Sequence, residues 1–171
     1  MVITGVNLRE LIEQYDVVPL CCFDMFSLTL HLNSNITKYN MPAGHVVTYG
    51  EEIKNAHITR ETISSEYILN PGQAILASSC ERVKMPAGYM GFLQTKGSLA
   101  RLFVTVHCCD GQIEPGFEGR VTFEICNIGQ MRVRLLPECP IAQLFIIKTS
   151  SDKDFYDGKY NNSDEPTYSM K

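Results

Sequence analysis

Short runs of β-forming residues separated by turn residues constrain this fold more than any other feature of the sequence. They recur from residue 26 onward, and turn sequences such as Asn-Pro-Gly at 70–72 and Pro-Gly at 115–116 separate them. Many short strands at regular spacing are typical of a β sandwich or barrel. We therefore predict an all-β fold. The predicted strands cover residues 28–32, 45–49, 73–77, 91–94, 103–107, 120–126, 132–135 and 141–147.

The N-terminal segment, residues 1–20, has a helical pattern instead. Asn7 and Glu10 have the spacing of a capping box, and the apolar residues Leu8, Leu11 and Ile12 follow at helical intervals. This pattern predicts a short amphipathic helix over residues 7–15.

Length and charge narrow the class of protein. A chain of 171 residues fits one domain, residues 1–171, and is long enough to bury a core. The 15 Lys and Arg against 19 Asp and Glu give a net charge of −4, so we expect no nucleic-acid partner. Apolar runs such as 141–147 are too short to span a bilayer, and the N-terminus has no basic segment before an apolar one. We predict a cytoplasmic protein with no membrane partner.

The seven cysteines are an odd number and include two adjacent pairs, 21–22 and 108–109, which cannot readily bridge within themselves. We predict reduced, mostly buried thiols. No Cys-x-x-Cys occurs, so we expect neither zinc nor a protein-bound metal.

A cationic cluster at residues 96–101 is suited to phosphate oxygens. Arg101 offers a planar fork, Lys96 a point charge and Ser98 a hydroxyl, and Gly97 lets the backbone approach a ligand closely. A solvated turn before a strand is the alternative interpretation, and it is favoured on this segment alone.

A carboxylate also interrupts an apolar strand. The alternation puts Val121, Phe123 and Ile125 on one face and Thr122, Glu124 and Cys126 on the other. Glu124 then either faces solvent at an edge or lines a pocket.

Three motifs together resemble a known family. KGSLAR at 96–101, IEPGFEG at 113–119 and VTFE at 121–124 are similar to the successive motifs of the dCTP deaminase branch of the dUTPase-like superfamily. The resemblance covers roughly residues 70–169. It implies a distorted jelly-roll or β-barrel domain, assembled as a homotrimer with active sites between subunits. One subunit would supply residues 96–101 and a neighbour Glu114 and Glu124.

The resemblance also implies roles for individual residues. In similar enzymes the glutamate matching Glu124 takes a proton from the water that attacks C4 of cytosine, and then helps to protonate the base and the departing ammonia. No zinc takes part, and Mg²⁺ is carried by the triphosphate. The catalytic set is then Glu124, Arg101 and Ser98, and the substrate-binding set is Lys96, Gly97, Ser98, Arg101, Asp110, Glu114, Thr122, Phe123, Lys159 and Ser163.

The C-terminal segment, residues 149–171, loses the apolar pattern and is similar to a lid that closes over the phosphates. We predict a flexible lid that orders when nucleotide binds. Three residues depart from the family pattern. Gly97 replaces a serine, Phe103 replaces a common glycine, and Asp110 replaces a small apolar residue.

The resulting hypothesis is hydrolytic deamination of dCTP to dUTP and ammonia. A dUTPase, or a bifunctional deaminase and dUTP diphosphatase, is the first alternative. The second is a catalytically inactive regulatory trimer that binds pyrimidine deoxynucleoside triphosphates, because Gly97 and Asp110 alter the pattern.

Overall fold

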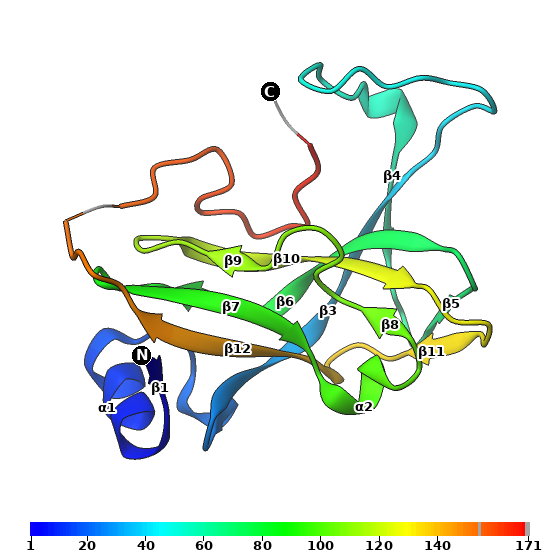
Figure 1. Ribbon diagram of the computed structural model, residues 1–171. Helices are drawn as coiled ribbons and strands as arrows, with labels where there is room; N and C mark the ends of the chain where they lie inside the picture. Colours follow the sequence, from blue (N-terminus) through cyan, green and yellow to red (C-terminus); the bar gives the residue numbers. More distant parts are fainter. Residues whose placement is uncertain (154, 170–171) are drawn as a thin grey trace.

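Antiparallel strands form a curled sheet that carries most of the chain (Figure 1). The computed structural model describes residues 1–153 and 155–169. The elements are β1 (Val2–Ile3), α1 (Gly5–Tyr15), the 3₁₀ turn η1 (Leu20–Cys22), β2 (Phe23–Asp24), β3 (Ser27–Tyr39), η2 (Asn55–His57), β4 (Ile58–Thr62), β5 (Tyr67–Leu69), β6 (Ala74–Lys84), β7 (Tyr89–Thr95), α2 (Gly97–Ala100), β8 (Val104–Thr105), β9 (Gln112–Ile113), β10 (Glu118–Asn127), β11 (Val133–Leu135) and β12 (Pro140–Lys148).

The main sheet has the strand order β8-β10-β6-β3-β12-β7-β9, with β1 beside β12 and with β2 and β4 beside β3. The short strands β11 and β5 pair separately. Alternate residues of the long strands are buried, including Leu28, Leu30 and Leu32 of β3 and Ala142, Leu144 and Ile146 of β12. The core therefore lies inside the curl of the sheet, and the all-β prediction is confirmed.

The predicted N-terminal helix is present as α1, and it buries Leu8, Leu11 and Ile12 as its spacing requires. The predicted capping box is wrong. The helix begins at Gly5 after Thr4, which makes no side-chain cap, so Asn7 already lies inside the helix.

The strand predicted at 45–49 is also wrong. These residues belong to an exposed loop between β3 and β4, and the side chain of Tyr49 is fully exposed. Gly44 and Gly50, with φ of 77° and 89°, bend the chain on either side. β-branched residues favour a strand only where a partner strand and a buried face are available, and here neither is.

The cysteines do not follow the prediction of mostly buried thiols. All seven are free, but Cys21, Cys108 and Cys109 are exposed, and among the seven only Cys22 is fully buried. Among the helices of residues 1–153 and 155–169, none has the length and apolarity that crossing a membrane requires.

Candidate active site

Strand β10 positions the central carboxylate of the site. Val121, Phe123 and Ile125 point into the core, and the side chains between them are partly exposed, as the alternation predicted. Glu124 pairs with Leu76 of β6, and its neighbour on the same face, Thr122, pairs with Ser78. Because two strands fix its backbone, Glu124 projects from a rigid element rather than from a loop.

A cavity of about 590 Å³ lies over this face of β10. Its polar lining includes Thr37, Asp110, Glu114, Arg120, Thr122 and Glu124, contributed by β3, the loop before β9, the turn after β9, and β10. This volume is within the range of small-molecule sites. A few converging polar groups on a mainly apolar wall are the usual form of such a site.

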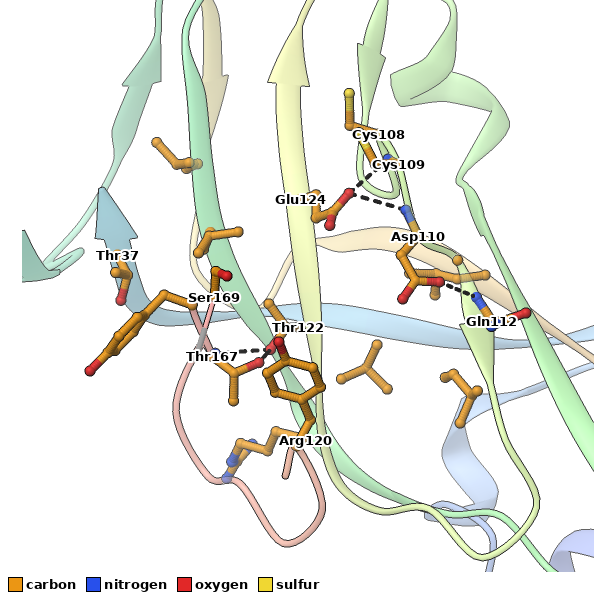
Figure 2. Close-up of a pocket in the computed structure, with 18 of the residues that line it drawn as sticks. Thr37, Cys108, Cys109, Asp110, Gln112, Arg120, Thr122, Glu124, Thr167 and Ser169 are labelled. Carbon is orange, nitrogen blue, oxygen red and sulfur yellow. Dashed lines mark hydrogen bonds between the residues drawn. The ribbon is translucent and has the colours of Figure 1, made fainter. Parts of the chain in front are cut away.

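Two backbone N–H groups hold the Glu124 carboxylate (Figure 2). Cys109 donates to Glu124 Oε2 at 2.7 Å and Asp110 donates to the same oxygen at 3.2 Å. Both hydrogen bonds use one oxygen, and Figure 2 shows the second carboxylate oxygen outside them. The loop therefore orients the carboxylate while the second oxygen stays available to a ligand or water.

Thiols around the carboxylate stay protonated near neutral pH. Burial, followed by the nearby Cys108, Glu124 and Cys109, raises the pKa of Cys126 to about 12. The Cys108 thiol, followed by Glu124, raises the pKa of Cys109. Because thiols in this state are poor nucleophiles, the carboxylates that line the cavity, including Glu124, are the candidates for proton transfer.

The C-terminal segment lies across the same face of β10 in its own chain (Figure 1). Ser163 accepts a hydrogen bond from Arg120 N–H, and Thr167 N–H donates to Thr122 Oγ1 at 3.0 Å. The hydroxyls of Thr122 and Thr167 lie 2.9 Å apart, and Asp164 pairs with Arg82. Residues 155–169 therefore form one wall of the cavity. The predicted ordering of this segment by nucleotide stays a prediction, and residues 154, 170 and 171 of the predicted lid lie outside the described residues.

Comparison with known proteins decides the family. A family described as dCTP deaminase-like matches residues 4–149. The chain belongs to the dCTP deaminase-like family.

Individual members of the family support this membership. A protein named "dCTP deaminase, dUMP-forming" from Halobacterium salinarum is 37% identical over 123 residues, which are 68% of this chain and 63% of that protein. A protein of the same name from Methanospirillum hungatei is 34% identical over 138 residues, covering 73% of this chain and 75% of its own. The chain thus spans less than two thirds of the length of the first of these relatives.

A solved structure supports the fold. The 2'-deoxycytidine 5'-triphosphate deaminase from Agrobacterium tumefaciens has a TM-score of 0.64 at 18% identity, over 85% of this chain and 47% of that one. The predicted fold class is therefore confirmed.

The structure brings four of the predicted site residues of this dCTP deaminase-like chain together. Asp110, Glu114, Thr122 and Glu124 all line the cavity. Phe123 does not, because its side chain is completely buried in the core. Any contact of Phe123 with a substrate would have to come from its backbone.

Lys159 and Ser163 lie in the C-terminal segment beside the cavity rather than in its lining. The Lys159 ammonium lies 5.1 Å from the centre of the Tyr160 ring. The Ser163 hydroxyl donates to the carbonyl of Glu165 at 2.8 Å, so it supports the bend of the segment.

The cationic segment lies elsewhere in the chain. Gly97 and Ser98 belong to α2, and Lys96 and Arg101 flank it. None of the four lines the cavity that contains Glu124. Arg101 is exposed, and its guanidinium donates to the carbonyl of Gly97 at 2.9 Å. Within one chain, the predicted phosphate-binding and acid–base groups are therefore separate.

Sequence reasoning missed several parts of the cavity. Buried Thr37 and the exposed Tyr39 come from the end of β3, and Tyr156 comes from the C-terminal segment. The two N–H donors to Glu124 belong to the backbone, which carries no residue signature. A candidate signal for the lining was the cluster of tyrosines near the C-terminus, where three of the eight tyrosines fall within residues 156–168.

Proposed function

We propose that this protein deaminates dCTP hydrolytically, with Glu124 as the proton carrier. The observation that supports this most directly is the carboxylate of Glu124, held by two backbone N–H groups at a cavity of nucleoside size. Family membership supplies the substrate class.

The chemistry assigns each proton. Glu124 accepts a proton from a water molecule as the oxygen of that water bonds to C4 of the cytosine ring. Glu124 gives that proton to ring nitrogen N3, which took the electron pair displaced from C4 when the water added. Glu124 then carries the proton of the new C4 hydroxyl to the amino nitrogen, the bond from C4 to the amino nitrogen breaks, and ammonia leaves as the C4 carbonyl forms. The products are a uracil nucleotide and ammonia, and Glu124 returns to its ionised state.

Neighbouring side chains would position the base. Thr122 lies on the same face of β10, two residues from Glu124, and its hydroxyl hydrogen-bonds with the hydroxyl of Thr167. Asp110 is exposed at the cavity and can accept from the exocyclic amine that distinguishes cytosine from uracil. The substrate would be the Mg²⁺ complex of dCTP, with the ion carried by the phosphates.

A homotrimer would complete the site. The cavity lacks residues 96–101, so a neighbouring subunit would have to bring Lys96, Ser98 and Arg101 to the triphosphate. Exposed apolar side chains beside α2 support an interface there, because Leu102 is 39%, Phe103 61% and Ile128 73% exposed. Ile128 N–H donates to the Phe103 carbonyl, so these residues form one continuous surface.

A second candidate is deamination coupled to removal of pyrophosphate, which yields dUMP. Two observations favour it: Glu114 lies in the same cavity as Glu124, and the two relatives described above carry the words "dUMP-forming" in their names. Glu114 would orient a second water toward the phosphates.

Product analysis tests both candidates. The protein is incubated with dCTP or dUTP and Mg²⁺, and ammonia, pyrophosphate and uracil nucleotides are measured separately. Ammonia with dUTP supports simple deamination, and ammonia with equal pyrophosphate and dUMP supports the coupled reaction. Pyrophosphate without ammonia would reject deamination. Tight binding of dCTP without any product would favour the regulatory trimer instead.

A further inference from the structure

A second cluster of reactive side chains lies outside the cavity. Cys22, at the end of η1, meets His31 of β3 and Glu81 of β6, although the last two are 50 residues apart in the sequence. One ligand atom from each lies within 4.8 Å of the other two. None of the three lines the cavity around Glu124, so the proposed reaction gives this cluster no role.

Contacts within the cluster centre on one carboxylate oxygen. Glu81 Oε1 is 2.6 Å from His31 Nδ1 and 3.8 Å from Cys22 Sγ. The backbone N–H of His31 donates to the other oxygen, Glu81 Oε2, at 3.0 Å. This bond fixes the carboxylate so that Oε1 faces both the thiol and the imidazole.

A cysteine nucleophile does not fit this arrangement. Such a nucleophile needs the imidazole next to the thiol, whereas here the carboxylate contacts both groups. Burial, followed by the charge of Glu81, raises the pKa of Cys22 to about 12, which opposes a free thiolate. The neighbouring Cys21 contributes to the same rise in the pKa of Cys22.

We propose that Cys22, His31 and Glu81 bind one Zn²⁺ ion. Sulfur, imidazole nitrogen and carboxylate oxygen are the donors that this ion takes in proteins, and three protein ligands leave a fourth position for water. On binding, the Cys22 thiol loses its proton to solvent and the sulfur becomes a thiolate ligand. The exposed Cys21 interacts with the Cys22 thiol.

The spacing needs little adjustment. With bonds of about 2.0–2.3 Å, a tetrahedral ion separates its ligand atoms by about 3.3–3.8 Å. The 3.8 Å between Cys22 Sγ and Glu81 Oε1 already fits, and His31 Nδ1 must move away from Glu81 Oε1 by less than about 1 Å. Rotation of the partly exposed His31 side chain provides that movement, because 31% of it is accessible.

Such an ion would stabilise the fold rather than take part in the reaction. It would tie the segment between α1 and β2 to two central strands of the sheet, β3 and β6. A ligand that binds only the folded state raises its stability. The proposal does not depend on the proposed function, and its test uses no activity measurement.

Metal binding to the full chain tests the site directly. The protein is freed of metal with a chelator in a phosphine reductant, and is then titrated with Zn²⁺ by calorimetry and with Co²⁺ by absorption. We expect about one ion per chain, a thiolate-to-cobalt charge-transfer band with the intense visible bands of a tetrahedral site, and a Tm raised by about 5 °C with Zn²⁺.

Variants locate the ion. Cys22→Ser and Glu81→Gln should each weaken Zn²⁺ binding by about tenfold or more, and Cys22→Ser should abolish the charge-transfer band. Cys80→Ser is the matched control, because Cys80 is adjacent to Glu81 on β6 but its thiol faces the carbonyl of Leu32. It should bind as the unchanged protein does.

Two outcomes would overturn the proposal. One is the absence of any Co²⁺ band in the unchanged protein. The other is a band that survives Cys22→Ser and disappears in Cys108→Ser, which would put the ion among the thiols of the cavity. Glu81→Gln guards against a folding artefact, because it preserves the size of the side chain, and the circular dichroism of each metal-free variant is compared first.

Discussion

The cavity over β10 and the segment around α2 carry the two halves of one predicted site, and they differ in how complete they are. In the cavity, Glu124 is anchored by two strands and two N–H donors, and one chain supplies all of these contacts. Around α2, the exposed Arg101 donates to the carbonyl of Gly97 in its own turn, and neither residue lines the cavity that contains Glu124. One chain therefore supplies all the groups of the proposed proton transfer, whereas the proposed phosphate binding would need a second subunit.

The largest expected effect on activity comes from a substitution in the cavity over β10. Glu124→Gln keeps the shape and the acceptor oxygen, but it cannot carry a proton, so we expect kcat for ammonia release to fall by about 10³-fold. Affinity for dCTP, measured by calorimetry, should change by less than about threefold. Equal turnover by both proteins would show that Glu124 is not the proton carrier.

The proposed role of the segment around α2 in a neighbouring subunit's site is tested by mixing two inactive variants. Arg101→Ala should lose about 100-fold in kcat/KM if Arg101 contacts the triphosphate. When Arg101→Ala and Glu124→Gln chains are unfolded together and refolded as mixed trimers, about a quarter of the sites should regain both residues. Activity should return to about that fraction.

Recovery in the mixture requires that the site be shared between subunits. Should the mixed trimers be as inactive as each variant alone while native mass spectrometry shows that they contain both variants, then the shared site is wrong. Mixing Glu124→Gln with the unchanged protein is the matched control for the refolding step.

A smaller effect concerns the wall formed by the C-terminal segment. Thr122→Val removes the hydroxyl that contacts both Thr167 Oγ1 and Thr167 N–H, at a cost of about 1–2 kcal/mol for the docked segment. We expect cleavage within residues 155–169 by limited proteolysis to become several-fold faster. Thr105→Val, on β8 outside the cavity lining, is the control and should not change that rate.

The smallest expected effect is on stability, and it comes from the backbone conformation of Phe103. This residue has φ of 58°, in the left-handed region, and lies directly after the α2 turn. Phe103→Gly should be about 1 kcal/mol more stable to urea than Phe103→Ala, because only glycine adopts this conformation without cost. Equal stabilities would mean that the turn rearranges in the variants.

Much of the fold could be predicted because period-2 alternation is a local property. The alternation of residues 120–126 fixed which side of β10 carries Glu124, and the helical spacing of Leu8, Leu11 and Ile12 fixed the buried face of α1. The loop at 45–49 was mistaken for a strand because propensity does not reveal whether a partner strand exists.

The site was harder to predict because it depends on contacts between distant segments. The motif VTFE pointed to Glu124, but the donors from Cys109 and Asp110 are backbone groups that any residue could supply. The cluster of Cys22, His31 and Glu81 has no local motif at all, since three separate elements contribute it.

The alternation of β10 also limits how this protein can change over generations. A slip of one position in this strand would turn the Phe123 ring outward and drive the Glu124 carboxylate into the core. A single inserted or deleted codon between residues 122 and 124, where β10 and β6 pair in continuous register, would thus remove Glu124 from the cavity and bury its charge without a partner. Evolution of this stretch is therefore confined to exchanging one amino acid for another at constant length.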